Sequence, residues 1–191
     1  SSWLLNFLYY FFNNLSYFLS SKSFYIFIFH SNRIQQIYRN SEGNIWCLSA
    51  QKVYLFMTKE NRFIDVQQAF EKNGPTNVTI SNIFPLDNGV TWMVSEGGEC
   101  FRFIDNDPLN SCERMNYLFE RESDINIITL DNSGQEWIIS QKGLFIHGHD
   151  KAISHIPFHF FAERGKETWF ASTSGKMACY NPEKQTLSNI C

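Results

Sequence analysis

Short apolar segments separated by polar turns run along this chain from residue 34 to its end. The first segments are 34–39, 45–49, 53–57 and 63–66, and each is about as long as a β-strand. Turn pairs such as Asn88-Gly89 and Ser133-Gly134 separate such segments and supply the positive φ angles of tight hairpins. Apart from one short helical turn expected at 66–71, no segment carries a helical apolar stripe. The pattern therefore predicts an all-β chain of antiparallel strands.

The pattern repeats, and a tryptophan marks each copy. The four are Trp46, Trp92, Trp137 and Trp169, spaced by 46, 45 and 32 residues. A serine follows each tryptophan by three positions, and an Ile-x-x-Ile pair precedes the first three. A glycine lies three or four positions before each one: Gly43, Gly89, Gly134 and Gly165. Such periods, with one aromatic per copy, are typical of solenoids and propellers.

One meander of three or four strands cannot bury both of its faces, so the copies must pack on one another. We expect a partial β-propeller of about four antiparallel blades, a fragment of a larger ring. The expected blades are 33–77, 78–123, 124–154 and 155–191. The four tryptophans and their preceding glycines occupy equivalent positions, so we expect them to be structural anchors. Stacking of the indole rings on a ligand is the alternative.

The copy around Trp137 is the most complete, with D-x-x-G-x-x-W-x-x-S-x-x-G-L over residues 131–144. This pattern resembles the two-component regulator propeller repeat of the periplasmic sensor region of Bacteroidetes hybrid two-component systems. The resemblance covers residues 34–191. It departs from the repeat at Lys52, which replaces a turn glycine, and at Glu99 and Lys176, which replace a leucine.

The resemblance implies a ligand-sensing segment in the periplasmic part of an inner-membrane protein. Its implied partners are an oligosaccharide ligand and the other blades and downstream domains of the full-length protein, where any kinase activity would lie. The ligand-contacting residues are unknown, and the polar loops 67–77 and 106–123 are the candidates because they do not repeat. A protein-interaction propeller scaffold and a propeller lyase remain as alternatives. The lyase would need a cluster of His, Glu and metal, for which only the His147 to His159 region offers candidates.

Composition narrows these classes. The chain has 191 residues, 43% of them hydrophobic, and a net charge of −3, so a packed core is expected and a nucleic-acid partner is not. There is no G-x-S-x-G elbow and no phosphate-binding glycine loop. We therefore expect no catalytic residues, no enzyme activity in this chain and no cofactor.

The cysteines and histidines are the candidates for disulfide and metal sites. The five cysteines show no C-x-x-C spacing, and their odd number is against a complete disulfide framework; a Cys100–Cys112 bridge across a loop is the alternative. His147 and His149 project from the same side of an extended chain and resemble zinc ligands. Residues 148–151 look more like a polar hairpin turn, so we expect no metal site.

The first 32 residues are a different kind of sequence, with twelve aromatic residues and no acidic one. Three interpretations are open: a degenerate signal or membrane anchor, a mistranslated leader, or strands of an earlier blade. The apolar run is too short and interrupted for an ordinary membrane span. Membrane contact is therefore expected only through this segment or through parts that the chain lacks.

Overall fold

The computed structural model describes residues 34–49, 52–73, 78–115, 119, 124–149 and 151–190. The aromatic segment 1–32 and its three interpretations lie outside these residues. In the part of the chain that is described, fifteen strands form four antiparallel sheets, and there is one short helix. The predicted all-β class is confirmed.

The sheets follow one another along the chain, and in each of them every strand pairs with the next in sequence. Sheet I contains β1 (Ile34–Arg39), β2 (Ile45–Ser49), β3 (Lys52–Met57) and β4 (Arg62–Asp65). Sheet II contains β5 (Ile80–Pro85), β6 (Val90–Ser95), β7 (Cys100–Ile104) and β8 (Glu113–Met115). Sheet III contains β9 (Ile125–Leu130), β10 (Glu136–Ser140) and β11 (Gly143–Ile146). Sheet IV contains β12 (Phe160–Arg164), β13 (Glu167–Ala171), β14 (Met177–Asn181) and β15 (Thr186–Ile190).

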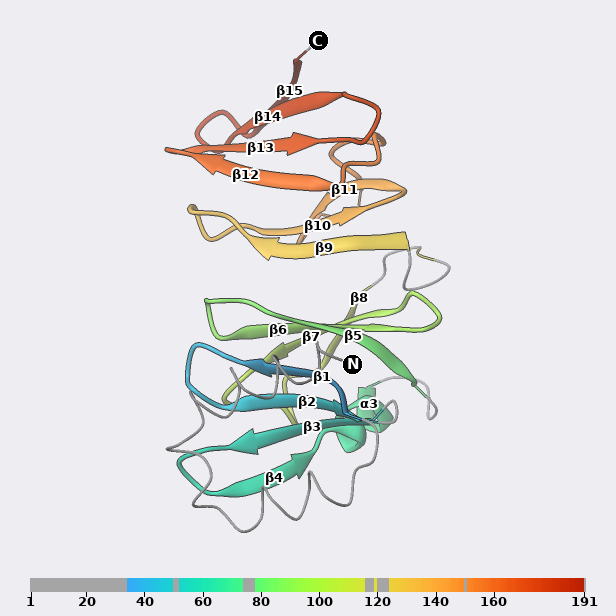
Figure 1. Ribbon diagram of the computed structural model, residues 1–191, viewed down its shortest axis with the longest axis vertical. Coiled ribbons are helices and arrows are strands. Elements are labelled where there is room, and N and C mark those ends of the chain that lie inside the picture. The colour runs from blue at the N-terminus through green and yellow to red at the C-terminus, as the bar shows by residue number, and fades with distance from the viewer. Residues whose placement is uncertain are drawn as a thin grey trace, which may run out of the picture.

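Figure 1 shows the four sheets stacked along the long axis of the molecule in chain order. An apolar core fills each of the three junctions between neighbouring sheets. Trp46, Trp92 and Trp137 are fully buried, one in each core. Trp46 and Trp137 contact aromatic rings of the following sheet, Phe103 and Tyr180, and Trp92 contacts the imidazole ring of His147, directly after β11. The cores therefore hold consecutive sheets together through a large ring at an equivalent place.

The Ile-x-x-Ile pairs are explained by a bulge. A spacing of three would normally place two strand residues on opposite faces of a sheet. The register of β5 shifts between Ile80 and Asn82, however, and that extra residue returns Ile80 and Ile83 to one face. Both isoleucines are buried in the core between sheets I and II. The first strands of sheets I and III carry the same irregularity.

Sheet III lacks a regular fourth strand among the described residues. The chain after β11 makes a single antiparallel bridge there, between Leu144 and Ser154. The connection packs so closely that a Cβ on Gly143 would lie 2.0 Å from the Ser154 carbonyl oxygen. The short interval between Trp137 and Trp169 thus corresponds to a fourth strand reduced to one bridge.

A short helix connects sheets I and II. It was predicted at 66–71 and is confirmed as α3 (Gln67–Asn73). Phe70 is fully buried and meets Phe101 and Phe103 edge to face, with ring centroids 4.9 and 5.3 Å apart. This helix therefore belongs to the core between the two sheets.

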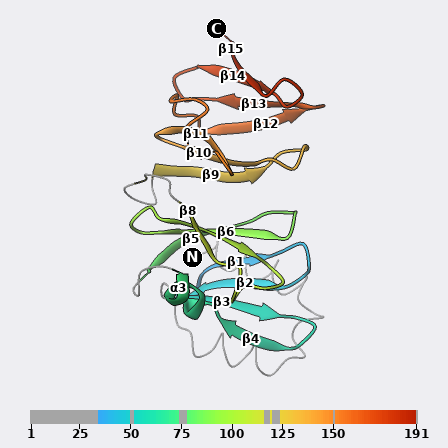
Figure 2. The same cartoon turned by 180° about the vertical axis from the view of Figure 1, so that it is seen from behind.

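The hairpin turn between the first two strands of each sheet lies on one side of the stack. Figure 1 shows these turns on the left, and the reverse view in Figure 2 shows them on the right. Their glycines all have positive φ angles, from 63° to 85°: Gly43, Gly89, Gly134 and Gly165. The sequence therefore places a tight turn at the same edge of every sheet, which we call the turn edge (residues 40–44, 86–89, 131–135 and 165–166).

The repeated serines have a structural role. Ser95 and Ser172 each accept a hydrogen bond, at 3.0 Å, from the backbone N–H four residues later. In the tighter turn of sheet III, the Ser140 hydroxyl donates to the Gly143 carbonyl at 2.8 Å. These three serines thus close the turns between the second and third strands of sheets II, III and IV.

Candidate ligand-binding pocket

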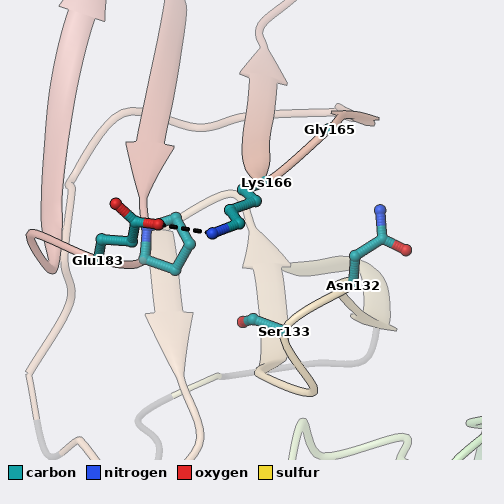
Figure 3. A pocket seen from close by; sticks show the side chains of 6 residues that line it. Asn132, Ser133, Gly165, Lys166 and Glu183 are labelled. Carbon is teal, nitrogen blue, oxygen red and sulfur yellow. Dashed lines mark hydrogen bonds and ion pairs between the residues drawn. The ribbon is translucent and has the colours of Figure 1, made fainter.

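A pocket of about 340 Å³ opens on the turn edge where sheets III and IV meet. Three turns supply its lining: β9–β10, β12–β13 and β14–β15 (Figure 3). The six lining residues are Asn132, Ser133, Gly165, Lys166, Pro182 and Glu183. The pocket therefore exists only because two consecutive sheets bring their turns together.

A buried carboxylate fixes the turn that carries Asn132 and Ser133. Asp131 Oδ1 accepts the backbone N–H groups of Ser133 and Gln135, each at 2.9 Å, and the Ser133 hydroxyl at 2.6 Å. The backbone N–H of Asn132 donates to the Glu163 carboxylate of sheet IV. These contacts tie the turn both to itself and to the next sheet.

The same carboxylate joins the pocket to the core. Asp131 Oδ2 accepts the indole N–H of Trp137 at 2.8 Å and the hydroxyl of Thr168 at 3.3 Å. Burial acts to raise the pKa of Asp131, but the hydrogen bonds from Ser133 and Trp137 outweigh it and leave the pKa lowered. Asp131 is therefore an ionised structural group at neutral pH.

The two charges in the lining neutralise each other. Lys166 Nζ lies 2.8 Å from Glu183 Oε1, and the dashed line in Figure 3 marks this pair. The hydrogen bond raises the pKa of Lys166 and lowers that of Glu183. Both side chains are strongly exposed, so the pair holds loosely in water.

The lining offers hydrogen-bonding groups beside the Lys166–Glu183 pair. Within the described residues the Asn132 side-chain amide has no protein partner, and the Ser133 hydroxyl is engaged by Asp131. The six lining residues include no histidine, cysteine or aromatic ring. The exposed polar groups of this surface can donate and accept hydrogen bonds.

The loops that sequence reasoning favoured for ligand contact do not contribute to this pocket. Residues 67–73 form α3, and Phe70 anchors them in the core. Within 106–123, Glu113–Met115 form the fourth strand of sheet II, and Cys112 is buried. The pocket instead uses turns of the repeat itself.

A second polar cluster lies in the junction of sheets II and III. Glu136 is only 6% exposed, and it receives two hydrogen bonds from Arg102, at 2.8 and 2.9 Å. It also accepts the Trp92 indole N–H at 2.7 Å. Burial acts to raise the pKa of Glu136, and the hydrogen bonds from Arg102 and Trp92 outweigh it, so the pKa is lowered. The cluster is closed and satisfied, which is typical of a structural ion pair.

The histidines weighed as metal ligands do not come together. His147 lies between two carboxylates, with a ring nitrogen 3.9 Å from Glu136 and the other 3.9 Å from Glu113. His159 contacts Gln141 at 3.2 Å, and His149 is exposed. Among the residues that the structure describes, no three His, Cys, Asp or Glu side chains are grouped to hold a metal ion.

The described cysteines are free thiols, so the Cys100–Cys112 bridge considered above is not formed. Cys100 packs in the junction of sheets II and III, whereas Cys112 packs in that of sheets I and II. Burial raises the pKa of each thiol to about 12. Both side chains therefore behave as small apolar groups.

The tryptophans and glycines of the repeat differ in their surroundings. Trp46, Trp92 and Trp137 are fully buried, whereas Trp169 is only half-buried. None of these indoles lines the pocket, and Gly165 is the one repeat glycine that does. No helix in the described ranges is long and apolar enough to cross a membrane.

No protein-family model and no curated protein matches the chain. Solved structures do match it. The extracellular domain of the hybrid two-component system BT3049 from B. thetaiotaomicron has a TM-score of 0.54 at 14% identity over 83% of this chain. PorZ, a surface component of the type-IX secretion system of Porphyromonas gingivalis, has a TM-score of 0.50 at 10% identity over 82%. A chain of the mitotic checkpoint complex has a TM-score of 0.51 at 9% identity over 81%.

This chain spans 22% of the length of the first two matched chains and 49% of the third. At identities this low, the matches show the fold alone. The matched structures confirm the predicted propeller-like arrangement of antiparallel sheets and agree, at the level of fold, with the resemblance to two-component regulator propellers.

Proposed function

We propose that this chain is a ligand-sensing segment in the periplasmic region of a hybrid two-component regulator, and that its ligand is a neutral oligosaccharide derived from a glycan. The pocket between sheets III and IV carries the proposal, because it gathers hydrogen-bonding groups from three turns. The fold likeness to an extracellular domain of a hybrid two-component system and the repeat motif around Trp137 support the setting. Any kinase step belongs to other domains of such a protein.

Charge favours a neutral ligand. Lys166 and Glu183 are paired with each other, so the lining presents no net charge to a ligand. Sugar hydroxyls both donate and accept, and can therefore use the Asn132 amide, the ammonium group and the carboxylate together. An acidic sugar would have to compete with Glu183 for Lys166.

Titration calorimetry of the full chain with neutral xylo-, malto- and manno-oligosaccharides, and with acidic oligogalacturonides, tests this proposal. We expect a neutral oligosaccharide to bind, and Lys166→Met and Asn132→Ala each to weaken it at least tenfold. Lys176→Met is the matched control, because Lys176 is an exposed lysine in the turn between β13 and β14, outside the pocket lining. The proposal would be contradicted if none of the three substitutions changed the affinity, or if no oligosaccharide bound at millimolar concentration.

The lyase alternative gains no support from these contacts. Its candidate residues were the histidines between 147 and 159, and His147 is held between Glu113 and Glu136 while His159 contacts Gln141. The scaffold alternative predicts no oligosaccharide binding, so the same calorimetry distinguishes it from the sensor.

A further inference from the structure

The three junctions between sheets share one polar arrangement. In each of them a tryptophan of one sheet faces the following sheet, where the residue immediately before the next tryptophan is polar and buried. These residues are Thr91, Glu136 and Thr168, with exposures of 0%, 6% and 2%. The repeated position therefore places a hydrogen-bonding group inside every junction.

The chemistry of this position depends on the neighbour of the tryptophan on the third strand of its own sheet. Trp92 pairs across the strands with Arg102, and the facing residue is Glu136. Trp46 pairs with Leu55, and Trp137 with Ile146. In these two junctions the facing residue is a threonine, which donates to an aspartate beside the indole.

The junction of sheets I and II is one of the two that use a threonine, and the aspartate that accepts its hydrogen bond belongs to sheet II. Asp105 accepts hydrogen bonds from Thr91 at 2.6 Å and from Asn40 at 2.9 Å. The Trp46 N–H points toward the same carboxylate without reaching full hydrogen-bond geometry. Burial raises the pKa of Asp105, and the contacts with Thr91 and Asn40 oppose this rise.

The outer face of sheet IV repeats the tryptophan side of such a junction but is uncovered by any described residue. Trp169 projects from it while Phe170 and Tyr180 point back to Trp137. The Trp169 indole N–H is itself buried and has no hydrogen-bond partner among the described residues. On the third strand Trp169 pairs with Cys179, an uncharged residue, where Trp92 pairs with Arg102.

An apolar row crosses this face. The strand registers align Phe160, Ala171, Met177 and Ile190 across the four strands. Three of them are among the most exposed large apolar side chains of the described residues: Phe160 at 58%, Met177 at 42% and Ile190 at 38%. A contiguous apolar face of this kind indicates a packing surface.

The register also supplies a polar donor. Asn40 lies two residues beyond the partner of Trp46 on the first strand, and Arg164 lies two residues beyond Ala162, the partner of Trp169. Arg164 therefore occupies the place from which Asn40 donates to Asp105. Glu167 pairs with Arg164 across the hairpin and lies near Cys179, so it belongs to the same face.

We propose that the outer face of sheet IV binds a further antiparallel sheet of the same repeat, contributed by the continuing polypeptide, with a threonine before its own tryptophan and an aspartate after its third strand. The threonine type follows from Cys179, because the third-strand partner of Trp169 is uncharged, as Leu55 and Ile146 are in the two junctions that use a threonine. The aspartate accepts from Trp169 and Arg164. A second copy of this chain fits less well, because the residue before Trp46, the tryptophan of its sheet I, is Ile45.

The test extends the full chain after Ile190 with a copy of residues 78–115, the segment that carries Thr91 and Asp105. The probe is the Trp169 indole N–H signal in a nitrogen-15 NMR spectrum, assigned by Trp169→Phe. We expect its hydrogen exchange to slow at least a hundredfold in the extended chain. Thr91→Val with Asp105→Leu in the appended copy alone is the matched control, and it should abolish most of the protection.

Three results would overturn the proposal. One is an exchange rate that is unchanged by the extension, even if the appended segment fails to fold. Another is equal protection with the control copy, which would reduce the contact to apolar burial. The third is a stoichiometric dimer of the unextended chain with the Trp169 N–H already protected, because the face would then bind a second copy.

Discussion

At the scale of single residues, one position of the repeat decides how each junction is built. The residue before the tryptophan was not singled out from the sequence, because Thr91, Glu136 and Thr168 look like ordinary surface residues of short strands. Their burial becomes visible only when the following sheet is placed against the indole. The tryptophans themselves were recognisable because a large ring recurs at a fixed place.

Equivalent tryptophans should differ in their contribution to stability. Trp137→Ala empties a fully buried site and should lower the free energy of unfolding by roughly 3–5 kcal/mol. Trp92→Ala should cost a similar amount. Trp169→Ala should cost less than about 2 kcal/mol, because its side chain is less deeply buried than those of Trp92 and Trp137. Urea denaturation of the three variants measures this, and equal losses at all three sites would contradict it.

The Arg102–Glu136 ion pair between sheets II and III should contribute to the free energy of unfolding by an amount that depends on pH. Arg102→Met leaves Glu136 buried without its cation and should cost about 3 kcal/mol at pH 7. Arg114→Met, in the more exposed pair with Glu99, should cost less than about 1 kcal/mol.

The sign of the pH effect follows from the lowered pKa of Glu136 in the folded chain. Its stabilising contribution is present above the ordinary glutamate pKa of 4.5 and is lost as the pH falls through the lower folded value. The difference between wild type and Arg102→Met should therefore shrink on acidification below about pH 4.5. Denaturation curves at pH 7 and pH 4 would show a constant difference if the pair were unimportant.

At the scale of strands and turns, the sequence was most informative where turn chemistry is local. β1 and β2 have the predicted bounds because Asn40 to Asn44 mark the hairpin between them. The bulges could not be deduced, since an i, i+3 pair in a strand contradicts simple alternation until an extra residue is inserted. The pocket was missed for another reason: its turns are individually ordinary and gain meaning only through the contact between two sheets.

The bridge that replaces the fourth strand of sheet III should be sensitive to one methyl group. Gly143→Ala would place a Cβ 2.0 Å from the Ser154 carbonyl oxygen, at a φ of 132°, and should destabilise the chain by about 3 kcal/mol. Gly148→Ala is the matched control, with φ at 85° and open space around the added atom, and should cost about 1 kcal/mol. Thermal unfolding of both variants tests the difference, and equal shifts would show that the close contact relaxes freely.

At the scale of the whole molecule, the stack buries its apolar surface junction by junction. Each core contains residues of two consecutive sheets, so a sheet without a neighbour keeps one face in water. In the described residues the outer face of sheet IV has this property.

The full chain should therefore associate non-specifically and bind an apolar dye. Phe160→Gln, Met177→Gln and Ile190→Gln together should remove more than half of the dye fluorescence. Ile104→Gln should change it little, because Ile104 is exposed at 45% but lies outside that row. Sedimentation velocity beside the dye titration would contradict this account if the triple variant associated as strongly as the wild type.

The charged junction also protects the folding reaction against assembly in the wrong order. Sheets built on one repeat can in principle dock on any other copy, and misordered docking is a typical failure of repeat chains. If sheet III docked on sheet I, Glu136 would face Leu55 instead of Arg102 and would be buried without its cation. Such a mismatch costs several kcal/mol. The Arg102–Glu136 pair therefore favours docking of sheet III on sheet II over docking on sheet I.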